Sequence, residues 1–113
     1  MTTTRLDAEH ADCLRHQGLI ERARRALPVL QSRLSAKSAE VAIHAHDAAG
    51  GDERRWAACG GREAYAEELS LRDDVATLER LVAGAQPDSW HGWLRRADVD
   101  RILARAGLGT EEG

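Results

Sequence analysis

Apolar residues recur at every seventh position along the first half of the chain. The series consists of Leu6, Cys13, Ile20, Leu27, Leu34, Val41 and Ala48. Such a heptad series is typical of a helix that packs lengthwise against another helix. A companion series three residues later is apolar only in its middle, at Ala23 and Leu30. We therefore predict a long helical arm over about 5–49, with its widest buried stripe between positions 20 and 34.

Two features interrupt this pattern. Pro28 lies inside the first arm, where a proline removes one backbone hydrogen bond and kinks or breaks a helix. Gly50, Gly51 and Asp52 form the clearest turn signal, because glycine ends a helix in the left-handed conformation and aspartate caps the start of the next one. We predict a first arm that is kinked or broken near Pro28, followed by a turn at 50–52.

A second helical arm is predicted over about 53–84. Its heptad series is Ala57, Ala64, Leu71, Leu78 and Ala85, and Gly60-Gly61 would loosen its beginning. Folding the chain back at the turn pairs residues whose numbers sum to about 101. Large residues then face each other near the base of the hairpin, and small residues, such as those around Gly60, lie near its tip. The sequence thus favours an antiparallel helical hairpin.

The C-terminal segment begins after Gln86-Pro87-Asp88-Ser89, which is a break followed by a new helix start. One or two short helices are predicted over about 89–106, with Trp90 and Trp93 covering the base of the hairpin. Gly107 is predicted to cap the last helix, and 107–113 is predicted to be a tail. The expected fold is a single all-α domain over 1–113, because β-branched residues are scarce and show no alternation.

Composition and charge reduce the number of possible functions. The 113 residues carry a net charge of -3, and the basic residues are 15 arginines and one lysine, a bias typical of a GC-rich bacterial or phage genome. Residues 38–79 hold four basic and ten acidic groups. An acidic middle argues against a general phosphate-binding surface there.

Neither a metal site nor a disulfide framework is expected. His10, Cys13 and His16 are spaced by three, so the outer two diverge by about 120° around a helix, and His44 and His46 lie near the predicted tip. Zinc requires three or four converging ligands. The chain contains two cysteines and no apolar run of the roughly 18 residues that a membrane span needs. We predict a cytoplasmic protein without cofactor or metal.

Catalysis is not predicted either. The chain has no nucleophile elbow and no glycine-rich phosphate loop. Its paired carboxylates, Glu67-Glu68 and Asp73-Asp74, are adjacent in sequence and predicted to face solvent, where neighbouring helical residues diverge by about 100°. These are poor acid–base pairs, and we expect a protein that is not an enzyme.

The acidic second arm and the tryptophans are the candidate contacts for a partner. Glu63, Glu67 and Asp74 are predicted to line one side of the helix. The full predicted set is Asp52, Glu53, Trp56, Glu63, Glu67, Glu68, Asp73, Asp74, Trp90 and Trp93. An exposed acidic helix face promotes fast and selective association with a basic partner.

The sequence therefore predicts a small bacterial or phage adaptor or inhibitor, such as an anti-defence protein, which docks an acidic helical face on a basic protein. Two alternatives stay open. The heptad series could pair with a second copy in a homodimer or a virion component. The arginine cluster Arg22, Arg24 and Arg25 could bind nucleic acid, although direct nucleic-acid binding is not the expected function.

Overall fold

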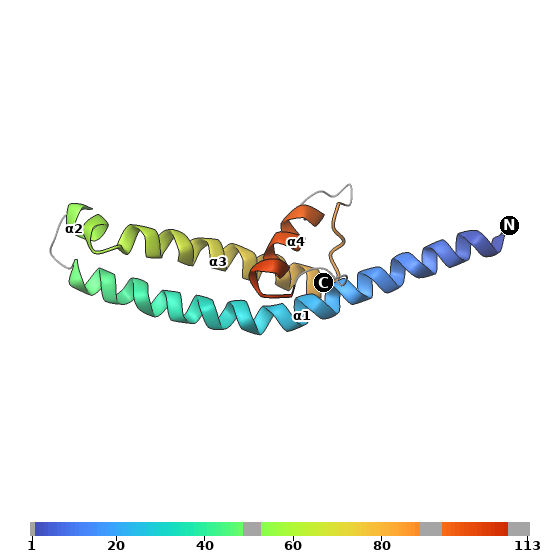
Figure 1. Ribbon diagram of the computed structural model, residues 1–113, viewed down its shortest axis with the longest axis horizontal. Coiled ribbons are helices and arrows are strands. Elements are labelled where there is room, and N and C mark those ends of the chain that lie inside the picture. Colours follow the sequence, from blue (N-terminus) through green and yellow to red (C-terminus); the bar gives the residue numbers. More distant parts are fainter. Residues whose placement is uncertain (1, 49–52, 89–93, 109–113) are drawn as a thin grey trace. The chain divides into compact units, whose positions relative to one another are not determined.

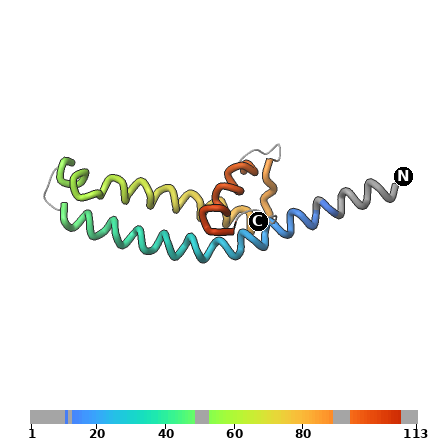
Figure 2. Tube along the Cα trace, viewed as in Figure 1, coloured from blue at the N-terminus to red at the C-terminus, as the bar shows by residue number. Residues whose placement is uncertain are grey.

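Helices joined by short turns and irregular segments make up the part of the chain that the structure describes. The computed structural model describes residues 2–48, 53–88 and 94–108, with side chains from Ala11 onward except Asp12 (Figures 1 and 2). Its elements are α1 (Thr2–Asp47), α2 (Glu53–Ala58), α3 (Gly61–Val82) and α4 (Arg96–Arg105). No strand occurs in these ranges, so the predicted all-α class is confirmed. None of the four helices is both long and apolar enough to cross a membrane.

The chain divides into two compact units. The terminal unit comprises residues 1–27 and 77–113, and the central unit comprises residues 28–76. Each unit contains part of α1 and part of α3. The predicted organisation as one domain stays a prediction.

The central unit is an antiparallel pair of helix segments. The second half of α1 runs in one direction and the first part of α3 runs back, with α2 preceding α3 (Figure 1). At the α2 end, Gly60 lies beside the His44 imidazole, and the Cys59 thiol donates to the His44 carbonyl oxygen at 3.9 Å. The buried apolar residues of this unit are Leu30, Ala64, Leu71 and Val75.

The terminal unit packs α4 with the beginning of α1 and the end of α3. Asp88 Oδ1 accepts a hydrogen bond from the Arg96 backbone N–H at 3.2 Å, so an upstream side chain satisfies one of the exposed donors at the start of α4. The buried apolar residues of this unit are Leu19, Ala23, Ala26, Leu78, Leu81, Leu94, Val99, Ile102, Leu103 and Ala106. The side chains of this core are aliphatic.

Helix α1 is continuous through Pro28. A proline inside a helix costs roughly 3 kcal/mol, and buried Ala26 and Leu30 on either side of it supply packing that offsets this cost. Of the two alternatives predicted at Pro28, the break is therefore excluded, and the kink stays a prediction. The helix also begins earlier and ends earlier than the predicted limits of 5 and 49.

The heptad series of α1 is not its buried stripe. Cys13 is exposed, and Ile20, Leu27, Leu34, Val41 and Ala48 are only half-buried. The buried positions are Leu19, Ala23, Ala26 and Leu30. A straight α-helix drifts about 20° per heptad, so a seven-residue series moves off any fixed seam over six heptads. The companion positions Ala23 and Leu30, with the flanking Leu19 and Ala26, follow the helical repeat more closely and form the core.

The second arm consists of two helices instead of one. Helix α2 ends at Ala58, and Gly60, with a φ of 89°, separates it from α3. The glycine pair thus breaks the arm that it was expected only to loosen. The pairing at this end also differs from the predicted register. Residue numbers that sum to about 101 would place Gly60 opposite Val41, whereas Gly60 lies beside His44.

The remaining boundaries were partly predicted. Residues 50–52 and 89–93 lie outside the described residues, so the turn and the beginning of the C-terminal segment stay predictions. Helix α4 spans Arg96–Arg105 and lies within the predicted range of about 89–106. Its predicted cap is confirmed: Gly107 has a φ of 81°, and the Leu108 N–H donates to the Leu103 carbonyl at 2.8 Å in a Schellman arrangement.

Candidate functional site

The outer side of α3 in the central unit carries exposed apolar side chains. Tyr65 is 47% exposed and Leu69 is 40% exposed. They are four residues apart, so they are neighbours on one face of the helix. The same face, opposite the buried residues, contains further exposed positions at the same helical spacing. We define the Tyr65 face as Arg62, Tyr65, Ala66, Leu69, Arg72 and Asp73.

Charged side chains border the Tyr65 face at both ends. Arg62 Nη2 lies 3.5 Å from Glu53 Oε1, and both side chains are exposed. Arg72 Nη2 lies 3.8 Å from Glu68 Oε1, one helical turn earlier. Each arginine thus lies beside a carboxylate at one end of the face.

The predicted acidic docking face is only partly at the surface. Glu63, Glu67 and Asp73 are exposed, whereas Glu68 is 7% exposed and Asp74 is 3% exposed. The expectation that both members of each carboxylate pair face solvent is therefore wrong. Adjacent helical residues diverge by about 100°, so when one member of a pair lies outside, the other turns toward the neighbouring helix.

The predicted line of acids lies at a different place on α3 than expected. Glu63, Glu67 and Asp74 do share one side of α3, as their spacing requires. That side is the edge of the packed face, because Asp74 on it is buried. The centre of the exposed surface is occupied by Tyr65 and Leu69, which the sequence analysis did not single out. Their i, i+4 spacing, away from the heptad series of the same helix, was the signal that could have identified them.

The α2 end of the central unit is more closely packed than predicted. Trp56 is half-buried instead of exposed, and its ring lies against Gly61. A Cβ atom at position 61 would approach Trp56 Cε3 to 2.3 Å, so only glycine allows this contact. Trp56 therefore acts first as a packing residue. Glu53 is exposed, while Asp52, Trp90 and Trp93 lie outside the described residues and stay predictions.

Three side chains on α1 form a polar row beside this end. Lys37 Nζ donates to Glu40 Oε2 at 2.6 Å, and Glu40 Oε1 lies 3.7 Å from His44 Nε2. Within the described residues, the buried Nδ1 of His44 has no hydrogen-bond partner. The hydrogen bond from Lys37 holds the pKa of the Glu40 carboxyl below its usual value, against a smaller opposing effect of desolvation and with a further contribution from His44.

Replacing Lys37 with methionine is expected to raise the pKa of Glu40. A carboxyl whose pKa is lowered on folding contributes stability above its unfolded pKa and loses it as the pH falls through the folded value. The stability of the variant should therefore depend less on pH in the acid range. A carbon-detected NMR titration of the Glu40 carboxyl measures the change, and Lys37→Arg, which keeps the charge, is the control. An unchanged Glu40 titration in Lys37→Met would contradict this account.

Metal ligands do not converge in the described part of the chain. No group of three or more histidine, cysteine, aspartate or glutamate side chains there has the placement to hold a metal ion. The side chain of His10 lies outside the described residues, and Cys13 and Cys59 are free thiols.

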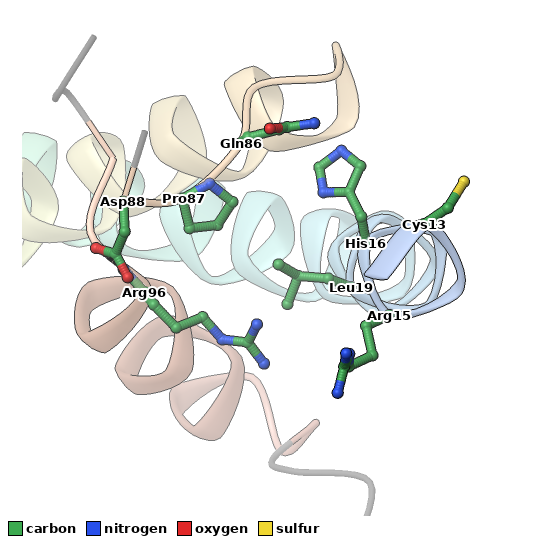
Figure 3. A pocket seen from close by; sticks show the side chains of 8 residues that line it. All are labelled: Cys13, Arg15, His16, Leu19, Gln86, Pro87, Asp88 and Arg96. Carbon is green, nitrogen blue, oxygen red and sulfur yellow. Dashed lines mark hydrogen bonds between the residues drawn. The ribbon is translucent and has the colours of Figure 1, made fainter. Parts of the chain in front are cut away.

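The terminal unit contains an open hollow with a volume of about 520 Å³. One wall is α1, which contributes Arg15, His16 and Leu19. The other wall contains Pro87, from the segment that follows α3, and Arg96, from the first turn of α4 (Figure 3). Two guanidinium groups and an imidazole thus line this hollow together with the Asp88 carboxylate, the Gln86 amide and apolar side chains.

The predicted arginine cluster is only partly at the surface. Arg15, Arg24 and Arg25 are exposed, whereas Arg22 is half-buried.

Comparison with known proteins adds nothing to these sites, since no family model, curated protein or solved structure matches the chain. Any assignment of function therefore depends on the geometry of this structure.

Proposed function

We propose that this protein is a non-enzymatic binding module, an adaptor or inhibitor, which docks the Tyr65 face on a basic protein. The observation that supports the proposal is the exposure of two large apolar side chains, Tyr65 and Leu69, side by side on α3. Exposed leucines are common when they occur singly. A tyrosine and a leucine that share one helix face, between two arginines, have the composition of a binding surface.

The chemistry of the Tyr65 face resembles that of interface centres in general. Tyrosine and arginine are enriched among the residues that dominate binding energy, and such residues are surrounded by a polar rim that excludes water. Tyr65 and Leu69 would supply the apolar centre. Arg62, Arg72 and Asp73 would supply the rim.

The charge of the central unit indicates the kind of partner. Residues 28–76 contain six basic and nine acidic side chains, whereas the rest of the chain contains ten of each. The whole net charge of -3 therefore belongs to the unit that carries the Tyr65 face. Exposed Glu63 and Glu67 lie near this face, and exposed Asp73 belongs to it. A partner with an apolar stripe bordered by lysine or arginine would be attracted to it, and its association rate would fall with salt.

Site-specific crosslinking in the native host tests the proposal. A photoreactive amino acid at Ala66 samples the Tyr65 face without removing Tyr65 or Leu69. The same label at Ile43, which is 62% exposed on α1 of the same unit, is the matched control. We expect a specific adduct from position 66 with a basic protein, and its yield should fall as salt rises.

The double variant Tyr65→Ala/Leu69→Ala distinguishes docking from chance proximity. Loss of a dominant contact weakens binding by about 2 kcal/mol or more, which is roughly a 30-fold change in affinity, so the adduct at position 66 should nearly disappear. Stability should change by no more than about 0.5 kcal/mol, because both side chains are exposed. An adduct that survives the double variant, or that forms equally at position 43, contradicts the proposal. An adduct between two copies of this chain would replace it with self-assembly.

A further inference from the structure

We propose that the hollow of the terminal unit binds a small organic phosphate, with the phosphate between Arg15 and Arg96 and the organic group against Leu19 and Pro87. This site lies in a different unit from the Tyr65 face and is independent of the proposed docking function. Its volume of about 520 Å³ is in the range of small-molecule pockets, roughly 300–1,000 Å³. A phosphate group alone would leave most of that space unfilled.

The positive groups come from both walls of the hollow. Arg15 and His16 project from α1, and the Arg96 side chain extends from the first turn of α4 toward α1 (Figure 3). Arg96 Nε donates to Asp100 Oδ1 at 3.0 Å, which fixes the plane of the guanidinium and uses one of its five N–H donors. Two guanidinium groups suit a ligand with the two negative charges of a phosphate monoester better than a ligand with one carboxylate. Arginine binds phosphate oxygens through parallel hydrogen bonds.

Among the described residues that line the hollow, Asp88 carries the carboxylate, and its hydrogen bond explains its position. Its Oδ1 accepts from the Arg96 N–H at 3.2 Å, and its own N–H donates to the Leu94 carbonyl at 2.7 Å. In Figure 3 the Asp88 carboxylate lies farther from α1 than the Arg96 guanidinium does. Asp88 therefore supports the beginning of α4 from the edge of the hollow, while the cationic groups lie closer to α1.

The apolar part of the lining indicates a ligand with an organic group. Leu19 projects from α1 between His16 and Arg15, and Pro87 stands on the other wall (Figure 3). An aromatic or branched aliphatic group placed there would cover apolar surface at about 25 cal/mol per Å² of area removed from water. The His16 imidazole adds a further polar group to the lining. The hollow thus combines a cationic end with an apolar end.

Calorimetric titration of the full chain with three probes tests this site. Phenyl phosphate carries both the anion and the apolar group, inorganic phosphate carries only the anion, and benzoate replaces the phosphate by a carboxylate. We expect phenyl phosphate to bind at least about fivefold more tightly than either of the other two, because only it uses both ends of the hollow. Equal binding of phenyl phosphate and inorganic phosphate would overturn the assignment of the apolar end, and no binding of any probe at millimolar concentration would overturn the site.

Matched variants test which residues form the site. Arg15→Gln and Arg96→Gln should each weaken phenyl phosphate binding by about tenfold, the usual effect of losing a charge-assisted hydrogen bond. Arg24→Gln, which removes an exposed arginine of α1 outside the hollow, should leave the affinity unchanged. Asp88→Asn keeps an oxygen acceptor for the Arg96 N–H but removes the negative charge, so it should strengthen binding. Equal losses in Arg24→Gln and Arg96→Gln, or weaker binding in Asp88→Asn with an unchanged circular dichroism spectrum, would contradict the site.

Discussion

Replacing Leu103 with alanine is expected to lower the free energy of unfolding by about 2–5 kcal/mol. Leu103 is fully buried in the terminal unit, together with Ile102 and Val99 of the same helix. Truncation removes apolar contacts and leaves a cavity, and the surrounding packed side chains relax only partly to fill it. Small domains have only about 5–15 kcal/mol of total stability, so the loss should be visible as a large shift in the denaturation midpoint.

Urea denaturation followed by circular dichroism measures this effect. Leu14→Ala is the matched control, because Leu14 is 53% exposed on α1 and its truncation should change stability by no more than about 0.5 kcal/mol. Equal losses in the two variants would show that Leu103 does not lie in a packed core.

A second large effect is expected at Gly61. Gly61→Ala should destabilise the protein by about 1–3 kcal/mol, the usual cost of overpacking, because a Cβ atom there would approach Trp56 Cε3 to 2.3 Å. The sign of this stability change is informative, since alanine ordinarily stabilises a helix by up to about 1 kcal/mol relative to glycine. A change that should favour α3 by its helix propensity is thus expected to disfavour the fold.

A double-mutant cycle with Trp56→Ala isolates the contact. Without the Trp56 ring, Gly61→Ala should cost little or should even stabilise the protein. Chemical denaturation of the four variants measures the coupling. The same loss in both backgrounds would mean that the Trp56 ring is not the group that alanine meets.

The buried positions of α1 were hidden from the sequence because of the geometry of the helix. The seven-residue repeat identified α1 as a packed helix but placed the core one position away, on Ile20 and Leu27 instead of Leu19 and Ala26. Heptad spacing is close to the helical repeat without equalling it, so several neighbouring lines of residues look equally apolar over short stretches. Only the neighbouring helices decide which of these lines is covered.

The candidate binding surface shows the same limit. The abundance of acids on the second arm was evident from the sequence, and so was their common side. Whether that side faced solvent was not, and the burial of Glu68 and Asp74 moved the exposed surface to Tyr65 and Leu69. Arg15 and Arg96 are 81 positions apart in the chain, and no local pattern could have placed them around one hollow.

The sequence by itself determined the all-α class, the presence of a long first helix, the cap at Gly107 and the acidic character of the central residues, because helix propensity, capping chemistry and charge are local properties. The tertiary structure alone decided that α1 continues through Pro28, that Trp56 packs against Gly61 and that Tyr65 and Leu69 remain outside. Each of these outcomes depends on what a neighbouring helix covers, and that depends on contacts between residues far apart in the chain.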